Sequence, residues 1–269
     1  MLFKNHICPK CSTSFDATSK FCPQCGESNK DLKEHSIGSG YLSIHWGYQL
    51  GCFFIGTVIL FILSFCALAI TMSFTDEENA KMISNFIIYG AAFCFLIPII
   101  VLNAKKIFPK FAKLKPYLIG IGIGAAVIIF SILNTELIKL LKLGESTNQN
   151  ELSSRAIIDT YPILSILIMG IIGPICEEFT YRVGLFSIVG RINRILAYII
   201  SSLVFALMHM DFSASSNIII ELLNLPSYIF AGVAFAFAYD KFSLPCSVTA
   251  HTVNNLFAVI VQIIVSNIK

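Results

Sequence analysis

Six polar side chains lie within otherwise apolar segments in the last third of the chain: Glu177, Glu178, Arg182, His209, His251 and Asn255. Such groups are costly in apolar surroundings and usually mark a functional site. Two carboxylates, two imidazoles and one amide, gathered in a pocket that water can reach, suit the hydrolysis of an amide bond. The sequence therefore predicts a hydrolytic site in this part of the chain.

Two mechanisms use these residue types. In the first, Glu177 takes a proton from water as a general base, while an imidazole and an amide stabilise the developing oxyanion. In the second, a glutamate and two histidines hold a catalytic zinc ion with one open position. The residue types leave both open. Ser201, Ser202 and Ser247 have no base at a matching spacing and suit helix packing instead.

Helical spacing predicts which of these side chains share a face. Glu178 and Arg182 are four residues apart, so we expect an ion pair on one helix face. Glu177 is rotated by about 100° from Glu178 and can point elsewhere. His251 and Asn255 are also four residues apart, so both can face one cavity.

A helical hairpin is expected to bring these faces together. Its tip is Gly190–Arg194, and Glu177 and His209 both lie about 22–26 Å from that tip at about 1.5 Å per residue. In a last helix that begins near Pro245, His251 lies about 9 Å deep. The hairpin and the last helix can therefore surround one site, provided that the hairpin protrudes from the membrane by about 10 Å.

The amino-acid composition is typical of a membrane protein. Of the 269 residues, 56% are hydrophobic and 13% are charged, which is about half of the usual charged share. A spanning helix needs about 20 mostly apolar residues. We therefore expect an all-α, polytopic transmembrane bundle of about seven or eight helices. Seven segments qualify as crossings: 47–72, 83–102, 117–133, 157–176, 195–210, 218–239 and 246–267.

The lysines predict the orientation of this bundle. The connection 103–116 carries five lysines and no acid, whereas 73–82 carries three acids and one lysine. The positive-inside rule places the first connection in the cytoplasm and the second outside. Residues 135–143 predict a short interfacial amphipathic helix, and 144–155 predict an exposed loop.

Other polar and aromatic residues of the last third receive structural interpretations. Asp211 and Glu221 are expected to lie near the outer boundary in contact with water. The aromatic-rich stretch from Tyr228 to Tyr239 is expected to face lipid and neighbouring helices.

Four cysteines near the amino terminus form two C-x-x-C pairs: Cys8, Cys11, Cys22 and Cys25. Four thiolates fill the tetrahedral shell of a structural zinc ion, which supplies the folding free energy of so small a module. A disulfide pair or a redox dithiol is the alternative. Reduced thiols indicate the cytosol.

The composition changes along the chain and predicts its domains. Residues 1–30 are expected to form a zinc ribbon, 31–45 a linker and 46–269 the membrane domain. The ribbon could recruit a protein partner. The net charge of +3 gives no indication of a nucleic-acid partner.

Three motifs of the membrane domain resemble those of the CPBP family, the CAAX-processing and bacteriocin-processing group of intramembrane proteases. Glu177 to Arg182 resembles its E-E-x-x-x-R motif, Phe205 to His209 its F-x-x-x-H motif, and His251 to Asn255 its H-x-x-x-N motif. The resemblance covers about residues 157–267, the expected protease core, and does not extend to the cysteine module.

This resemblance implies a role for each motif residue. Glu177 is the expected general base, and His209 places or activates water. The other positions are an oxyanion-stabilising pair and two supporting residues: His251, Asn255, Glu178 and Arg182. A metal-free glutamate mechanism is favoured, because the amide of Asn255 is a poor zinc ligand and a good hydrogen-bond donor.

The resemblance also implies a helical bundle with a cavity open to the cytosolic side. The expected function is an intramembrane endopeptidase of the bacterial inner membrane, with the ribbon in the cytoplasm. Its expected partners are membrane lipid and a peptide or protein substrate. The alternative is a non-proteolytic scaffold or bacteriocin self-immunity protein that retains these residues for architecture. A transporter is disfavoured, because the sequence has no internal repeat.

Overall fold

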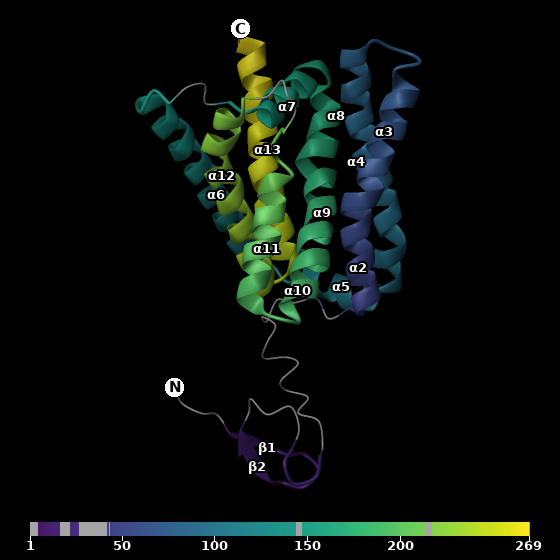
Figure 1. The fold of residues 1–269 in the computed structure, drawn as a ribbon, viewed down its shortest axis with the longest axis vertical. Helices are drawn as coiled ribbons and strands as arrows, with labels where there is room; N and C mark the ends of the chain where they lie inside the picture. The colour runs from purple at the N-terminus through teal and green to yellow at the C-terminus, as the bar shows by residue number, and fades with distance from the viewer. Residues whose placement is uncertain are drawn as a thin grey trace.

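The computed structural model describes residues 5–16, 22–26, 42, 44–143, 147–212 and 217–268. In this part of the chain, two short strands belong to the amino-terminal module and the other elements are helical (Figure 1). The predicted all-α polytopic bundle is confirmed. Among the described residues, six helices are long and apolar enough to span a membrane: Trp46–Thr71, Glu77–Leu102, Lys115–Leu140, Pro162–Gly190, Ile218–Lys241 and Leu244–Ile268.

One of the seven predicted crossings is too short to span. Where the sequence predicts a crossing at 195–210, α11 covers Arg194–Leu207, which is 14 residues. At about 1.5 Å per residue it reaches about 21 Å, less than the hydrocarbon core of about 30 Å. The predicted hairpin is present, because α11 turns back directly after Gly190. Asn193 caps α11 by accepting a hydrogen bond from the Leu196 N–H at 3.0 Å.

The first two spans each have a distinct local feature. The first joins α2 (Trp46–Phe54) and α3 (Leu60–Thr71) through a π-helical segment, Ile55–Ile59. The second, α4 (Glu77–Leu102), leads into α5 (Ala104–Phe111), a short helix that carries three lysines. The remaining long elements are α6 (Lys115–Leu140), α7 (Gln149–Thr160), α12 (Ile218–Lys241) and α13 (Leu244–Ile268).

The fourth span, Pro162–Gly190, is the central helix of the bundle. Half of the residues in its most apolar stretch are buried, compared with 17% in the corresponding stretch of α13. Two π-helical segments interrupt it, and such segments frequently occur at functional sites. Its parts in chain order are α8 (Pro162–Leu167), Ile168–Ile172 (π), α9 (Gly173–Glu178), Phe179–Phe186 (π) and α10 (Ser187–Gly190).

Two glycines allow α6 to approach α13 closely. A Cβ atom at Gly120 would lie 2.7 Å from the Cys246 carbonyl oxygen, and one at Gly124 would lie 2.6 Å from that of Ala250. Real Cβ atoms do not come so near, so a larger residue at either position would push the helices apart. Small residues commonly produce such close crossings in membranes.

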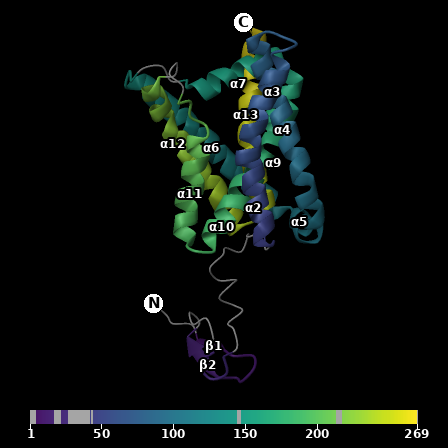
Figure 2. The ribbon, with the colours of Figure 1, turned by 45° about the vertical axis from the view of Figure 1, so that its right-hand side comes forward.

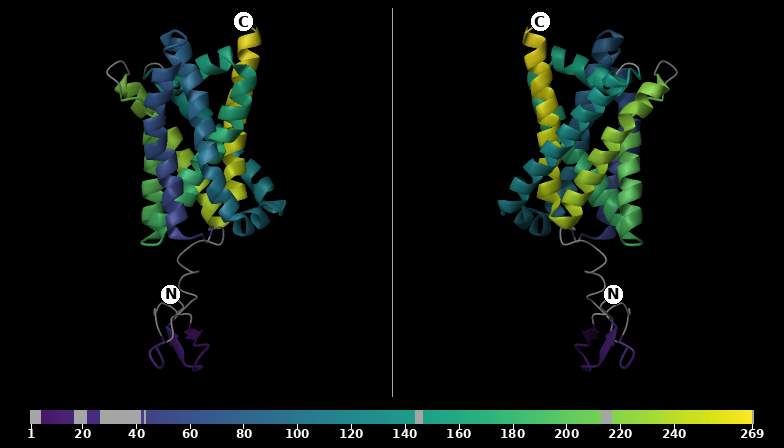
Figure 3. Two further views of the ribbon diagram at one scale, coloured as in Figure 1. Left: turned by 90° about the vertical axis from the view of Figure 1, so that its right-hand side faces the viewer. Right: turned by 90° about the vertical axis from the view of Figure 1, so that its left-hand side faces the viewer.

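Different elements form the two ends of the bundle (Figures 1 and 2). One end, called here the lysine-rich end, holds α5, the turn between α10 and α11, and the start of α2 (Figure 3). The opposite end, called here the α7 end, holds α7 and the carboxyl terminus of α13. Basic residues gather at the first of these ends: Lys105, Lys106, Lys110, Lys113, Lys115, Arg191, Arg194 and Lys241.

Two predictions about the connections are wrong. The predicted interfacial helix at 135–143 is the last part of α6, which continues to Leu140. The predicted exposed loop at 144–155 contains the start of α7, which Asn148 caps by accepting a hydrogen bond from the Glu151 N–H at 3.1 Å. A polar sequence forms a helix here because a capping residue and a packed partner at the α7 end stabilise it.

The amino-terminal module has a single antiparallel pair of strands. β1 (Asn5–Ile7) pairs with β2 (Ser14–Asp16). One C-x-x-C turn lies between the two strands, and the other follows β2. Most of the predicted linker, 31–45, lies outside the described residues. Its described end already belongs to the bundle, because Leu42 is buried and its N–H donates a hydrogen bond to the Tyr239 hydroxyl at 3.2 Å.

Candidate active site and metal centre

The Glu177 carboxylate lies at the centre of the intramembrane cluster. Its Oε2 atom is 3.8 Å from Nε2 of His209 and 3.7 Å from Nε2 of His251. These distances are longer than hydrogen bonds, and Oε2 is a buried acceptor without a hydrogen-bond partner in the structure. The imidazoles of His209 and His251 therefore face a free acceptor atom of Glu177, which is the arrangement that a general base needs.

A tyrosine holds the other oxygen of this carboxylate. The Tyr89 hydroxyl of α4 donates a hydrogen bond to Oε1 of Glu177 at 2.9 Å. This contact fixes the rotation of the carboxylate and leaves Oε2 directed at the two imidazoles. Sequence reasoning did not find Tyr89, because it lies 88 residues before Glu177 and no spacing within one helix connects the two.

Glu178, the next residue, has a fully satisfied carboxylate. Oε1 accepts a hydrogen bond from Nδ1 of His251 at 2.9 Å, and Oε2 accepts one from the Ser247 hydroxyl. Arg182 Nε lies 3.3 Å from Oε2, which is the predicted i,i+4 ion pair. Ser247 is therefore more than the packing residue expected from the sequence. The Glu178 contact places a proton on Nδ1 of His251 and turns Nε2 toward Glu177.

Arg182 is completely buried, and its side-chain exposure is 0%. Its guanidinium carbon lies 5.1 Å from the ring centre of Phe205 and 5.8 Å from that of Phe235. The ring faces and the carboxylate of Glu178 together compensate a cation that would otherwise be very costly at this depth.

Aromatic rings also orient the two imidazoles. Phe235 stacks on His251 with 4.4 Å between ring centres, and Tyr228 stacks on His209 with 4.9 Å. Of the two roles expected for the aromatic stretch, these two rings therefore have the packing role and not the lipid-facing one. His209 Nδ1 donates to the Phe205 carbonyl at 2.8 Å, so its Nε2 also faces Glu177.

Asn255 lies one helical turn beyond His251 and lines the same cavity. Its Nδ2 donates a hydrogen bond to the Met169 carbonyl at 3.1 Å, and its Oδ1 accepts one from Asn254 at 3.1 Å. An amide group has two N–H donors, so one donor remains for a bound group. The structure therefore brings all four predicted catalytic residues to one cavity.

The cavity has a volume of about 510 Å³ and extends from Glu177 toward the α7 end. The lining residues of α6 run from Val127 to Glu136, beyond the glycine contacts with α13, and α7 contributes Glu151 and Arg155. The lysines predict that the lysine-rich end is cytosolic, and the family resemblance implies that the cavity opens to the cytosol. Because the opening and the lysines lie at opposite ends, these two predictions cannot both hold.

Glu221 lies beside the cavity and is not solvated as the sequence predicts. It is only 1% exposed, although it sits in the first turn of α12. Its carboxylate accepts hydrogen bonds from the Gln149 N–H at 2.9 Å, the Asp211 N–H at 3.2 Å and the Asn148 amide at 3.3 Å. This carboxylate ties the start of α7 to α12 and to the segment that follows His209.

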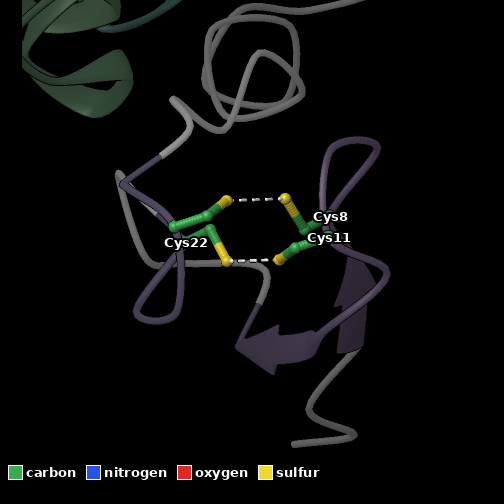
Figure 4. A group of neighbouring side chains, drawn as sticks. Cys8, Cys11 and Cys22 are labelled. Atoms are coloured by element: carbon green, nitrogen blue, oxygen red, sulfur yellow. Dashed lines mark hydrogen bonds between the residues drawn. The ribbon is translucent and has the colours of Figure 1, made fainter.

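The four amino-terminal cysteines form a compact cluster. Their Sγ atoms lie within 4.8 Å of one another, with 3.5 Å between Cys8 and Cys25 and between Cys11 and Cys22 (Figure 4). A disulfide requires about 2.05 Å, whereas tetrahedral zinc thiolates stand about 3.8 Å apart. Hydrogen bonds with Thr13 lower the pKa of the Cys11 thiol to about 6, which favours the thiolate. The cluster can bind a metal ion.

Comparisons with known proteins agree with these motifs. The family model described as type II CAAX prenyl endopeptidase Rce1-like matches residues 159–257, which contain all six motif residues. The chain is 31% identical over 233 residues to the membrane-embedded CAAX protease MroQ of Staphylococcus aureus, covering 77% of this chain and 88% of that protein. The chain belongs to the CAAX-type membrane protease family.

Two further relatives of this CAAX protease match shorter stretches. An uncharacterised protein of Mycoplasma capricolum is 33% identical over 173 residues, 59% of this chain, and the match spans about half (48%) of that protein. The putative membrane peptidase YdiL of Bacillus subtilis is 31% identical over 115 residues, covering 41% of this chain and 43% of YdiL. No solved structure matches the chain.

Proposed function

We propose that this CAAX-type membrane protease is an intramembrane endopeptidase that uses Glu177 to activate water. One observation supports this most strongly: Oε2 of Glu177 is a buried acceptor without a partner, and two imidazole Nε2 atoms face it. Of the two adjacent carboxylates, Glu178 has both oxygens hydrogen-bonded, whereas Glu177 keeps one acceptor that faces the two imidazoles.

In the proposed reaction, a water molecule forms hydrogen bonds to both Oε2 of Glu177 and Nε2 of His209. Glu177 takes the proton as the water oxygen attacks the peptide carbonyl carbon. The carbonyl oxygen becomes an oxyanion and accepts hydrogen bonds from His251 and Asn255. Glu177 then returns the proton to the leaving amine. In this scheme the His251 ring carries both protons, and the adjacent Glu178 carboxylate balances its charge.

A zinc mechanism is the competing version of this proposal. Glu177, His209 and His251 are one carboxylate and two imidazoles, which is a common set of catalytic zinc ligands. We favour the metal-free version, because Asn255 supplies a hydrogen-bond donor rather than a ligand. The contact of His251 Nδ1 with Glu178 fits either version, since it leaves Nε2 available. Zinc content of the full chain with all four amino-terminal cysteines changed to serine tests this. One zinc ion per chain that disappears on His209→Ala would establish the zinc version.

The ribbon and the orientation belong to the same proposal. We infer that the four cysteines hold a structural zinc ion, because four thiolates at these distances leave no open position. The lysine-rich end and the ribbon are placed in the cytoplasm, and the protein in the bacterial inner membrane. The substrate is a peptide or protein chain, for which a CAAX sequence is one candidate suggested by the family. The ribbon is a candidate site for a protein partner.

The Glu177→Gln variant tests the endopeptidase proposal. Purified protein in liposomes is incubated with a mixture of peptides that carry apolar segments, and products are identified by mass spectrometry. We expect a loss of cleavage of about 10³-fold, within the range for removal of a general base. Glu77→Gln, at an exposed carboxylate of α4 outside the cavity, is the control and should retain activity. Equal cleavage by both variants would favour the non-proteolytic scaffold or immunity protein.

A further inference from the structure

The cavity and the cluster of basic residues lie at opposite ends of the bundle. We propose that the site is reached from the extracytoplasmic side, and that its substrate is a polypeptide segment presented from that side of the membrane. This inference rests on the proposed endopeptidase function and specifies its substrate class. Three observations carry it: the position of the cavity, the seal at the lysine-rich end and the charges at both ends.

The lining residues place the opening at the α7 end. Along α6 the cavity begins at Val127, because Gly120 and Gly124 hold the preceding part of the helix against α13. At its other limit the cavity is bounded by Glu151 and Arg155 of α7, which pair at 2.5 Å and are partly exposed. Charged side chains at a cavity rim require water or headgroups, so this rim faces the aqueous phase.

The lysine-rich end is closed by packed side chains. Tyr239 and Leu244 are 0% exposed, and both belong to the largest buried apolar cluster. The Tyr239 hydroxyl accepts the Leu42 N–H at 3.2 Å and contacts the Ser187 hydroxyl at 2.9 Å. Arg191 donates to the Gln49 side chain at 2.9 Å and so ties the hairpin tip to α2. A peptide therefore has no path to Glu177 through this end.

Two independent features place the lysine-rich end in the cytoplasm. The connection that contains α5 carries five lysines without an acid, and positive charge in short connections sets orientation. Four described basic residues lie at the α7 end, and three of them pair with a neighbouring acid: Lys81 with Glu77, Lys139 with Glu136 and Arg155 with Glu151; the fourth is Lys142. The cysteine module precedes α2 in the chain, and α2 begins at the lysine-rich end. Thiolate clusters persist in the reducing cytosol.

The walls and rim of the cavity fit a segment that leaves the outer leaflet. Ile132, Phe257 and Val261 line its membrane-facing side, and Glu136 and Arg155 lie at its rim. An apolar stretch followed by polar residues would match this change from apolar wall to charged rim. A cytosolic polypeptide end would meet the closed face instead. The expected substrate is therefore a translocated or outward-facing segment of a membrane-anchored chain.

Cysteine labelling in intact cells tests the direction of access. Three variants are made in the full chain after the lipid-exposed Cys66 and Cys94 are changed to alanine: Ser227→Cys in the cavity, Glu151→Cys at its rim, and Lys106→Cys on α5. Cells are treated with a membrane-impermeant maleimide before or after permeabilisation, and mass spectrometry locates the label. We expect the cavity and rim variants to react in intact cells, and the α5 variant to react only after permeabilisation.

The opposite pattern would overturn the proposal. A Lys106→Cys chain labelled in intact cells would reverse the orientation. A Ser227→Cys chain labelled only after permeabilisation, or under neither condition, would exclude access from outside. Labelling does not require cleavage, so its outcome is independent of the endopeptidase proposal. The peptide mixture added to right-side-out and inside-out vesicles tests the substrate class. We expect cleavage only in right-side-out vesicles, and cleavage only in inside-out vesicles would contradict the inference.

Discussion

The cysteine cluster and the intramembrane cluster differ in whether all of their polar atoms have bonding partners. The four thiols of the ribbon lie within 4.8 Å of one another, so a metal ion bound by all four would have no position left for a substrate. In the membrane domain, Glu178 is saturated in the same way, whereas Glu177 keeps one oxygen without a partner. A saturated polar cluster stabilises structure, and an unsaturated one can act on a bound molecule. The two adjacent glutamates carry this distinction within a single helical turn.

Removal of metal should have the largest effect of the tested changes, and it should affect the cysteine cluster but not the intramembrane cluster. The ribbon has a very small core, so chelation should unfold it, with a loss of about 10–16 kcal/mol of zinc-binding free energy. We expect trypsin to cut residues 1–41 rapidly after chelation, while the membrane domain stays resistant and cleavage of peptides continues. Loss of peptide cleavage in the chelated chain would contradict the separation. The same loss in a chain with the four cysteines changed to serine would show that the ribbon supports catalysis.

Glu178→Gln should affect stability more than any other change at the intramembrane site. The substitution leaves the buried Arg182 without its counter-charge, and breaking such a pair costs about 3–5 kcal/mol. Thermal unfolding in detergent measures the effect. Glu151→Gln is the matched control, because its ion pair with Arg155 is exposed and worth about 0.5 kcal/mol. Similar melting temperatures for the two variants would show that the fully hydrogen-bonded Glu178 stabilises the fold no more than the exposed Glu151 does.

Tyr89→Phe should have a smaller effect, on catalysis alone. The hydroxyl donates to Oε1 of Glu177, and a hydrogen bond to a charged group is worth about 1.5–3 kcal/mol. We expect a decrease in kcat of at least about 10-fold, with little change in KM, because the carboxylate loses its fixed rotation. The control is Tyr161→Phe, whose hydroxyl makes only a 3.4 Å contact with Asn79. An unchanged kcat for the Tyr89 variant would mean that packing alone orients Glu177.

The motif residues and the hairpin could be predicted from the sequence because both depend on spacing along one helix. The separate directions of Glu177 and Glu178, the Arg182 ion pair and the tip near Gly190 all follow from helical geometry. The contacts between helices could not be predicted in this way. Tyr89 and Glu221 reach the site from distant segments, and no periodicity indicates which helix packs beside which. Ser247 lies one turn before His251 on α13, so its spacing could have placed it on the same face.

The direction of the opening was the least predictable property. The depth of His251 can be counted along α13, but a count does not reveal which end of the site is packed shut. That depends on Tyr239 and Leu244, which the sequence presents only as further apolar residues. Similarly, the polar segment at the start of α7 has the composition of a loop, and only its packing against Glu221 explains a helix there.

The glycine contact between α6 and α13 also has a mechanical consequence. It anchors α6 at Gly120 and Gly124, while the remaining 16 residues to Leu140 extend for about 24 Å along one wall of the cavity. A tilt of about 5° around this pivot moves the far tip by about 2 Å. Such a tilt, with α12 following through the stacked rings of Phe130 and Phe230, would widen the gap between α6 and α13 toward the bilayer.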